Sequence, residues 1–222
     1  MAYNPEFAAL LPPTASQNVR DISPYSVIVR NGAPEPVLAY TVSWATTDAM
    51  GQTYKDYRTV CGANDAESQI PPNTDKLITV LNSPNEDAAS YLQRFQREPL
   101  TITLESVMFE DGSTAGGDTS ESMAQVKALL KAEFDLLQSV LAKDRSSIMS
   151  WLQGRVDSGP RPGSRLDLSN PFAGWYRFYQ AKQAARLIRI AEVKGVSEMI
   201  ASVQITLQNK RYPAALGTWR GQ

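Results

Sequence analysis

Apolar and polar residues alternate most regularly over residues 38–44, which read LAYTVSW. Side chains of a β-strand point alternately to opposite faces, so a period of two predicts a strand with one buried face. The residues expected in the core are Tyr40, Val42 and Trp44, and those expected at the surface are Ala39, Thr41 and Ser43. The chain is therefore predicted to contain a central strand here.

Four further segments are predicted to be strands: residues 25–30, 53–60, 76–81 and 100–109. The Gly- and Pro-containing sequences "NGAPEP" and "DAMG" are typical of the turns that separate strands. In residues 100–109 the alternation slips by one position, so a β-bulge is predicted near Glu105 and Ser106. Ser83 and Pro84 predict the start of a short helix inserted between the last two strands.

From Asp118 onward the apolar spacing changes to three and four residues, which predicts helices. Asp118 and Glu121 resemble a capping box at the start of a long helix. The residues expected along its apolar stripe are Met123, Val126, Leu129, Leu130, Phe134, Leu137, Val140 and Leu141. Residues 146–152 either extend this helix or form a second short one, and a loop is expected over 154–165.

Two more helices are expected near the C-terminus. Asn170 and Pro171 are an N-cap and a first-turn proline, and Gly195 follows the last helical residue. The apolar stripe expected on this helix consists of Phe172, Trp175, Tyr179, Ala185 and Ile188. The stripe expected on the following helix consists of Val196, Met199, Ile200, Val203 and Leu207.

Strands followed by helices favour an α+β fold. We predict an N-terminal immunoglobulin-like antiparallel β-sandwich, with an N-terminal arm, over residues 1–117. An all-helical segment of about three α-helices is expected over 118–222. The two parts form either one continuous core or two linked ones.

The chain contains no histidine. Imidazole is the commonest general base near neutral pH and a frequent metal ligand, so histidine-dependent hydrolases, zinc peptidases and facial-triad oxygenases are excluded. The single cysteine, Cys61, cannot form an intrachain disulfide and is interpreted as a small packing residue. No segment is apolar for the roughly 20 residues that a membrane span needs. The first residues lack the basic lead and apolar run of a signal peptide.

Charge is distributed unevenly along the chain, whose net charge is −1. Residues 1–110 carry 7 Lys/Arg and 13 Asp/Glu, whereas residues 111–222 carry 15 and 10. Within the helix after Pro171, the spacing of Lys182, Arg186 and Arg189 gathers them on one face. This face is interpreted either as a solvated surface, neutralised in part by the acidic first half, or as an anion-binding surface.

Trp44 on a central strand, Tyr40 on the same face and short, regularly spaced strands resemble the core of an immunoglobulin-like sandwich. The stretches "VRNGAPEPVLAYTVSW" and "LTITLESVMFEDGSTAG", with helices after them, also resemble bacterial, often secreted, proteins of unknown function. This resemblance implies no activity and no functional residue.

Carboxylates cluster around the turn after the last strand, at Glu105, Glu110, Asp111, Asp118 and Glu121. Two carboxylates at a suitable distance hydrolyse glycosides, but charges at a strand end beside a helix cap give the same pattern. Ala115 and Ser122 do not fit the calcium ligand positions of an EF-hand, and "GSTAGG" lacks the Lys-Ser/Thr of a P-loop. The sequence therefore indicates no catalytic, metal or cofactor-binding residue.

Three functional hypotheses remain. The first is a non-enzymatic binding or structural module of the cell envelope or exterior, whose partner is another protein or an anionic surface. The second is a histidine-free carboxylate hydrolase. The third is a polyanion-binding protein that uses Lys182, Arg186 and Arg189, with nucleic acid as the least favoured ligand because no recognised motif surrounds them. An extracytoplasmic location is expected, with a cytoplasmic one as the alternative.

Overall fold

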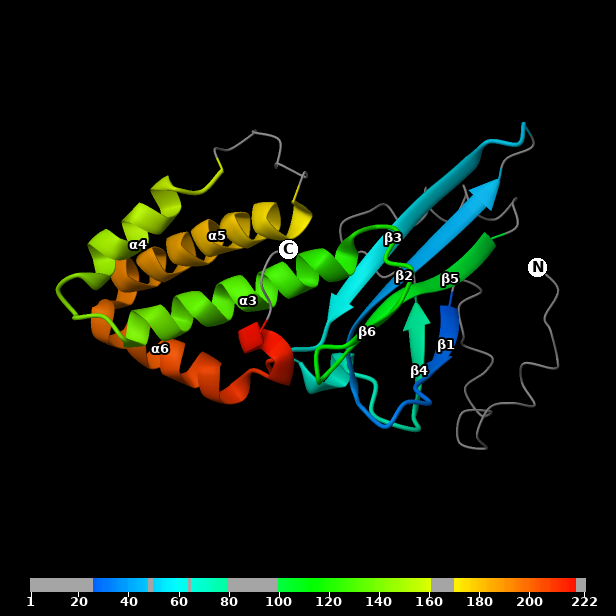
Figure 1. Cartoon of the computed structure of the whole chain (residues 1–222), viewed down its shortest axis with the longest axis horizontal. Coiled ribbons are helices and arrows are strands. Elements are labelled where there is room, and N and C mark those ends of the chain that lie inside the picture. Colours follow the sequence, from blue (N-terminus) through cyan, green and yellow to red (C-terminus); the bar gives the residue numbers. More distant parts are fainter. Residues whose placement is uncertain (1–25, 48–49, 64, 80–99, 161–169, 219–222) are drawn as a thin grey trace.

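The computed structural model describes residues 26–47, 50–63, 65–79, 100–160 and 170–218. Within these ranges strands precede helices, so the fold is mixed α+β (Figure 1). The strands are β1 (Ser26–Arg30), β2 (Val37–Thr47), β3 (Thr53–Cys61), β4 (Asp75–Thr79), β5 (Leu100–Phe109) and β6 (Thr114–Gly116). The helices are α3 (Ser122–Leu141), α4 (Ile148–Asp157), α5 (Pro171–Lys194) and α6 (Val196–Asn209), with 3-10 turns η2 (Ala66–Ser68) and η3 (Ala214–Thr218).

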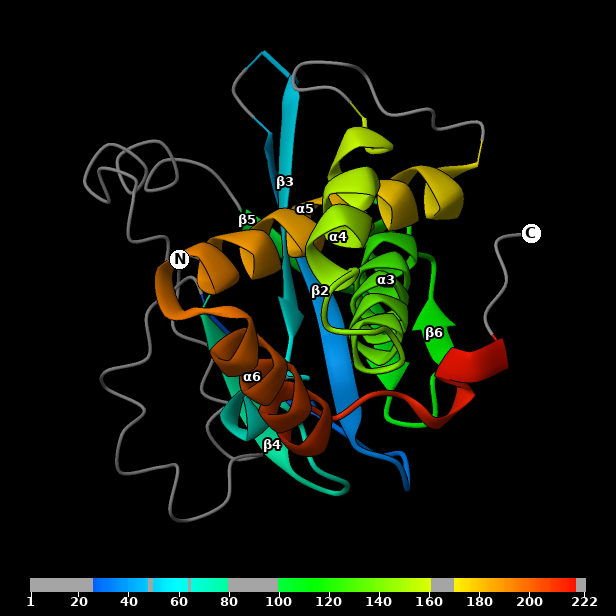
Figure 2. The ribbon, with the colours of Figure 1, turned by 90° about the vertical axis from the view of Figure 1, so that its left-hand side faces the viewer.

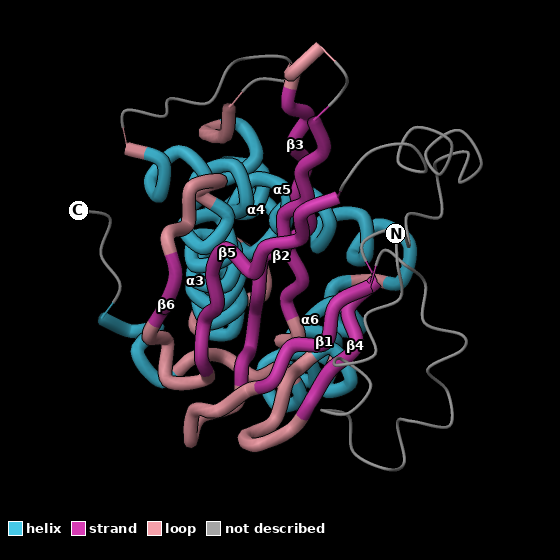
Figure 3. The backbone as a smooth tube through the Cα atoms, turned by 90° about the vertical axis from the view of Figure 1, so that its right-hand side faces the viewer, coloured by secondary structure: helices cyan, strands magenta, loops and turns pink. Residues whose placement is uncertain are grey.

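The strands form two antiparallel sheets (Figure 3). One sheet has the order β3-β2-β5-β6, and the other pairs β1 with β4. Each strand predicted from the alternation is present, with its ends displaced by no more than three residues. The antiparallel sheets of the first half are thus confirmed, while an immunoglobulin-like arrangement stays a prediction.

The predicted bulge lies on β5. Thr41 of β2 is opposite Ser106 and the next residue, Val42, is opposite Leu104, so Glu105 is the extra residue. The slip returns Val107 to the face that also carries Ile102, where both pack against the core. The interrupted alternation therefore predicted a real feature of the strand.

Three even-numbered residues of β2 face a core between the two sheets. Tyr40, Val42 and Trp44 are buried there, as predicted, together with Ile78 of β4. Val27 on β1 packs against the same cluster. The second sheet thus covers one face of the first.

The prediction for the odd-numbered residues of β2 is wrong. Ala39 and Thr41 are 0% exposed and Ser43 is 3% exposed, because the other face of the strand is covered as well. The α3 residues Met123, Val126 and Leu130 share a second core cluster with Ala39, Leu38 and Met108. The small side chains between the large ones on β2 therefore belong to a second buried face, and not to a solvent-exposed one.

From the sheet, α3 runs into the group of helices α4, α5 and α6 (Figures 1 and 2). These helices share a third core cluster, which includes Leu136 of α3, Leu152 of α4, Leu187 of α5 and Met199 of α6. After α6 the chain returns toward the sheet, where Leu216 of η3 joins the cluster beneath α3. One end of the helical part is thereby packed on the sheet.

Three expectations for the helical part need correction. α4 continues through Asp157, although residues 154–157 were assigned to a loop. A glycine inside a helix costs only about 1 kcal/mol, which the burial of Ile148 and Leu152 offsets. Leu141 and Ala185 were expected in apolar stripes but are exposed. In α5 the buried positions are instead Ala184, Leu187 and Ala191.

The capping residues predicted from the sequence act at the helix ends, with one exception. The Asn170 side chain accepts a hydrogen bond from the Ala173 amide, and Gly195 ends α5 with a φ of 89°. At α3 the Asp118 carboxylate accepts bonds from the amides of Met123 and Ala124. Glu121 makes no capping bond with its side chain and has a φ of 55°, so the reciprocal half of the expected capping box is absent.

Two expected segments lie outside the described residues: the N-terminal arm and the short helix near Ser83. β6 ends at Gly116, beside the boundary expected near Gly117, and the division of the chain there into two domains stays a prediction.

Candidate functional site

The three cations singled out from the sequence lie together on the outer face of α5. Lys182, Arg186 and Arg189 are all exposed. None of them forms an ion pair with another described residue, and Arg186 donates to the side chain of its neighbour Gln183 at 3.5 Å. We call these three residues the basic surface.

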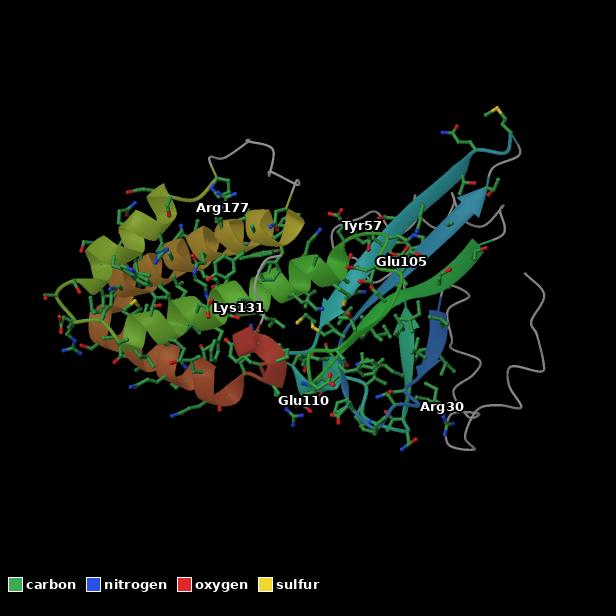
Figure 4. All side chains as sticks on the ribbon, viewed as in Figure 1. Arg30, Tyr57, Glu105, Glu110, Lys131 and Arg177 are labelled. Carbon is green, nitrogen blue, oxygen red and sulfur yellow. The ribbon has the colours of Figure 1, made fainter. Side chains whose placement is uncertain are left out.

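The buried face of α5 determines that the basic surface points away from the helical core. Ala184, Leu187 and Ala191 pack into the helical core, and in a helix they lie opposite positions 182, 186 and 189. Arg177 and Lys194 add exposed charge toward the two ends of α5, whose single acidic residue is Glu192. Figure 4 shows Arg177 projecting away from the other helices.

A polar network holds α5 on α3. The Tyr176 hydroxyl donates to Asp135 at 2.7 Å and accepts from Gln180 at 2.8 Å, while Lys131 binds both oxygens of Asp135. Burial and this bond to Asp135 raise the pKa of the Tyr176 hydroxyl well above its ordinary value. The network fixes the orientation of α5, and with it the basic surface.

No described acidic residue of the first half forms an ion pair with the basic surface. One ion pair between the first 110 residues and the C-terminal half occurs among the described residues, and Arg211 rather than α5 supplies its cation, to Glu110 at 3.1 Å. The charge of α5 is therefore directed to solvent.

Aromatic residues precede the basic surface on α5. Trp175 stacks on Tyr179 with ring centroids 5.8 Å apart, and Phe178 meets both rings edge to face. All three are half-buried, and burial raises the pKa of Tyr179. Their rings pack on one another, but none of the three belongs to a core cluster of the described residues.

The carboxylate of Glu105 lies on the sheet face near the start of α3 (Figure 4). It pairs with the Lys55 ammonium and accepts from the Thr119 hydroxyl at 3.0 Å. Burial alone would raise its pKa, but Lys55, Thr119 and the nearby hydroxyls of Ser120 and Ser43 together lower it. Its second oxygen, Oε2, is buried and has no hydrogen-bond partner.

The other carboxylates of the proposed hydrolase serve local structure. Asp118 caps α3, Glu110 binds Arg211, and Asp111 accepts from the amide and hydroxyl of Ser113, which lower its pKa. Glu121 is exposed. A glycosidase acid needs a raised pKa, whereas the pKa values of Glu105 and Asp111 are lowered. These contacts fit the structural interpretation better than catalysis.

Cys61 is half-buried at the end of β3. Burial raises the pKa of its thiol, which disfavours the reactive thiolate. Among the described residues, no cluster of three or more Cys, Asp or Glu side chains is arranged to hold a metal ion. Nor is any helix in the described part both long and apolar enough to cross a bilayer.

Comparison with known protein families, curated proteins and solved structures gave no match. The resemblance to bacterial secreted proteins accordingly stays a prediction.

The sequence did not indicate two ion pairs that the structure contains. Lys55 lies 50 positions from Glu105, and Lys210 lies 77 positions from its partner Glu133. The sequence signalled only the bulge at Glu105, and it gave no indication of the partner of this carboxylate.

Proposed function

We propose that this protein is a non-enzymatic binding module that holds an anionic polymer against the basic surface of α5. The observation that carries the proposal is that Lys182, Arg186 and Arg189 lie exposed on one helix face without an acidic partner among the described residues. A single-sign surface of this kind attracts anionic ligands and raises their association rate.

The polymer is favoured over the other anionic ligands considered. Stable attachment to a lipid surface needs an apolar anchor besides a basic patch, and Val193 is the single exposed large apolar residue described on α5. Single-stranded nucleic acid is bound by aromatic rings offered to bases, whereas Trp175 and Tyr179 are stacked on each other. An anionic polymer of the cell envelope requires neither feature. We therefore propose that the protein acts outside the cytoplasm. We also propose that its two sheets are arranged as in an immunoglobulin-like sandwich.

The test is the retention of the full chain on immobilised heparin at low salt. Replacing Lys182, Arg186 and Arg189 with glutamine should make the protein elute at a lower salt concentration, and the slope of log affinity against log salt should fall in magnitude by about 2 to 3. The matched control replaces Arg30, Lys143 and Arg145 with glutamine, which changes the net charge equally but leaves α5 intact.

Retention of the α5 variant equal to that of the control would contradict the proposal. Binding of the wild type to vesicles of anionic lipid, with no retention on heparin, would assign the surface to a membrane instead.

A further inference from the structure

β3 is an edge strand of the four-stranded sheet. Its one described partner is β2, which it pairs from Thr53 to Cys61. The β2–β3 hairpin projects beyond the helices (Figures 1 and 2), and no other described strand pairs with the outer edge of β3. Edge strands present backbone groups that template pairing with another strand.

The direction of these backbone groups follows from two hydrogen bonds. The Gly62 amide donates to the Leu38 carbonyl, so in this antiparallel ladder the even-numbered residues of β3 bond β2. The odd-numbered residues therefore direct their N–H and C=O groups outward. The Tyr57 amide agrees with this, because it donates to the side chain of Asp56 rather than to β2.

We propose that β3 pairs antiparallel with β3 of a second copy of the chain, about a twofold axis at Tyr57. In this register Asp56 lies opposite Arg58 of the second copy, and Arg58 lies opposite its Asp56. Both side chains are exposed, and both have contacts within their own chain that the pairing would exchange. Opposite charges directly across two strands stabilise the pair.

Charge selects this register over its neighbours. Moving the axis to Asp56 places Asp56 opposite Asp56, and moving it to Arg58 places Arg58 opposite Arg58. Like charges directly opposite each other are destabilising.

The interface is small, because a pair of nine-residue strands buries less surface than a standard stable complex. A weak dimer that dissociates at micromolar concentrations is therefore expected. Sedimentation equilibrium on the full chain measures it directly. Asp56→Arg should weaken the dimer about tenfold, since it replaces two attractive pairs by two repulsive ones.

The double variant Asp56→Arg with Arg58→Asp restores the opposite charges and should restore dimerisation. Asp157→Arg, an equal charge change on the exposed face of α4, is the matched control and should leave the dimer unchanged. This outcome is independent of the basic surface, whose glutamine variants should dimerise normally.

A cross-link tests the register. In a Cys61→Ser background, Tyr57→Cys should form an interchain disulfide, because the two residues face each other across the axis. Lys55→Cys should not, since the two copies of residue 55 lie four positions apart along the strands. A wild type that stays monomeric at all attainable concentrations, or a dimer that residue 55 cross-links as readily as residue 57, would overturn the proposal.

Discussion

Lys210 forms an ion pair with Glu133 across 77 positions of the chain, and each side chain is only 5% exposed. The pair joins the segment after α6 to the middle of α3. The Lys210 ammonium also lies 5.5 Å from the ring centroid of Tyr212, whose hydroxyl pKa is raised by burial and by the Glu133 carboxylate. This buried pair is one of the contacts that hold the returning chain, beside the Arg211–Glu110 pair and Leu216 in the core beneath α3.

Replacing Lys210 with methionine should lower the free energy of unfolding by about 3–5 kcal/mol, because Glu133 is left buried without a counterion. Urea denaturation followed by circular dichroism measures this loss. The exposed Lys182→Met variant should change stability by no more than about 0.5 kcal/mol. Equal midpoints for the two variants would show that the pair is unimportant.

Removing both charges distinguishes the attraction between Lys210 and Glu133 from the cost of leaving one unpaired charge buried. The double variant Lys210→Met with Glu133→Leu should be more stable than Lys210→Met alone, since no unpaired charge remains buried. A double variant that is less stable than the single one would show that the ion pair itself holds this region together.

A fragment ending at Gly117 should aggregate or bind hydrophobic dyes. Without α3, the buried face that carries Leu38, Ala39 and Met108 loses Met123, Val126 and Leu130 and is exposed to water. Dye binding and size-exclusion chromatography of residues 1–117 test this. A soluble, cooperatively unfolding fragment would mean that the sheets have a complete core of their own.

The strands were predictable because their alternation is a local property of the sequence. Even the bulge at Glu105 was visible as a slipped period. The burial of Thr41 and Ser43 was not, because it depends on segments distant in the sequence that cover the second face of β2. The pattern of small and polar residues in the sequence is the same whether that face of the strand is covered by protein or exposed to solvent.

The basic surface was predictable because Lys182, Arg186 and Arg189 lie on one element with helical spacing. The pairs Lys55–Glu105 and Lys210–Glu133 were not, since each joins distant segments that only the tertiary fold brings together. The continuation of α4 beyond Gly154 depended likewise on burial that a local pattern does not reveal.

Gly116 should not tolerate a side chain. Its φ is +100°, and a Cβ atom would lie 2.1 Å from the carbonyl oxygen of Glu105. Gly116→Ala should therefore cost about 2–4 kcal/mol through backbone strain and displacement of β6. Gly154→Ala is the matched control: its Cβ meets nothing within 4 Å, and in a helix it should stabilise by about 0.5–1 kcal/mol. Effects of the same sign would contradict this account of Gly116.

Glu105 should make the stability of the protein depend on pH in the acidic range. The pKa of its carboxyl is lower in the folded state, so its contribution is present above the unfolded value of about 4.3 and is lost as the pH falls through the folded value. Glu105→Gln removes this contribution, so its unfolding free energy should lie furthest below that of the wild type near neutral pH.

The gap between the two proteins should then narrow as the pH falls below about 4, where the wild-type carboxyl takes up its proton. Denaturant midpoints measured at several pH values give the gap directly. Glu192→Gln, an exposed change on α5, provides the control and should track the wild type throughout. A gap for Glu105→Gln that is constant or widens toward low pH would mean that the charge of Glu105 does not stabilise the fold. The contacts of Glu105 with Lys55 and Thr119 would then stabilise the fold through packing and not through charge.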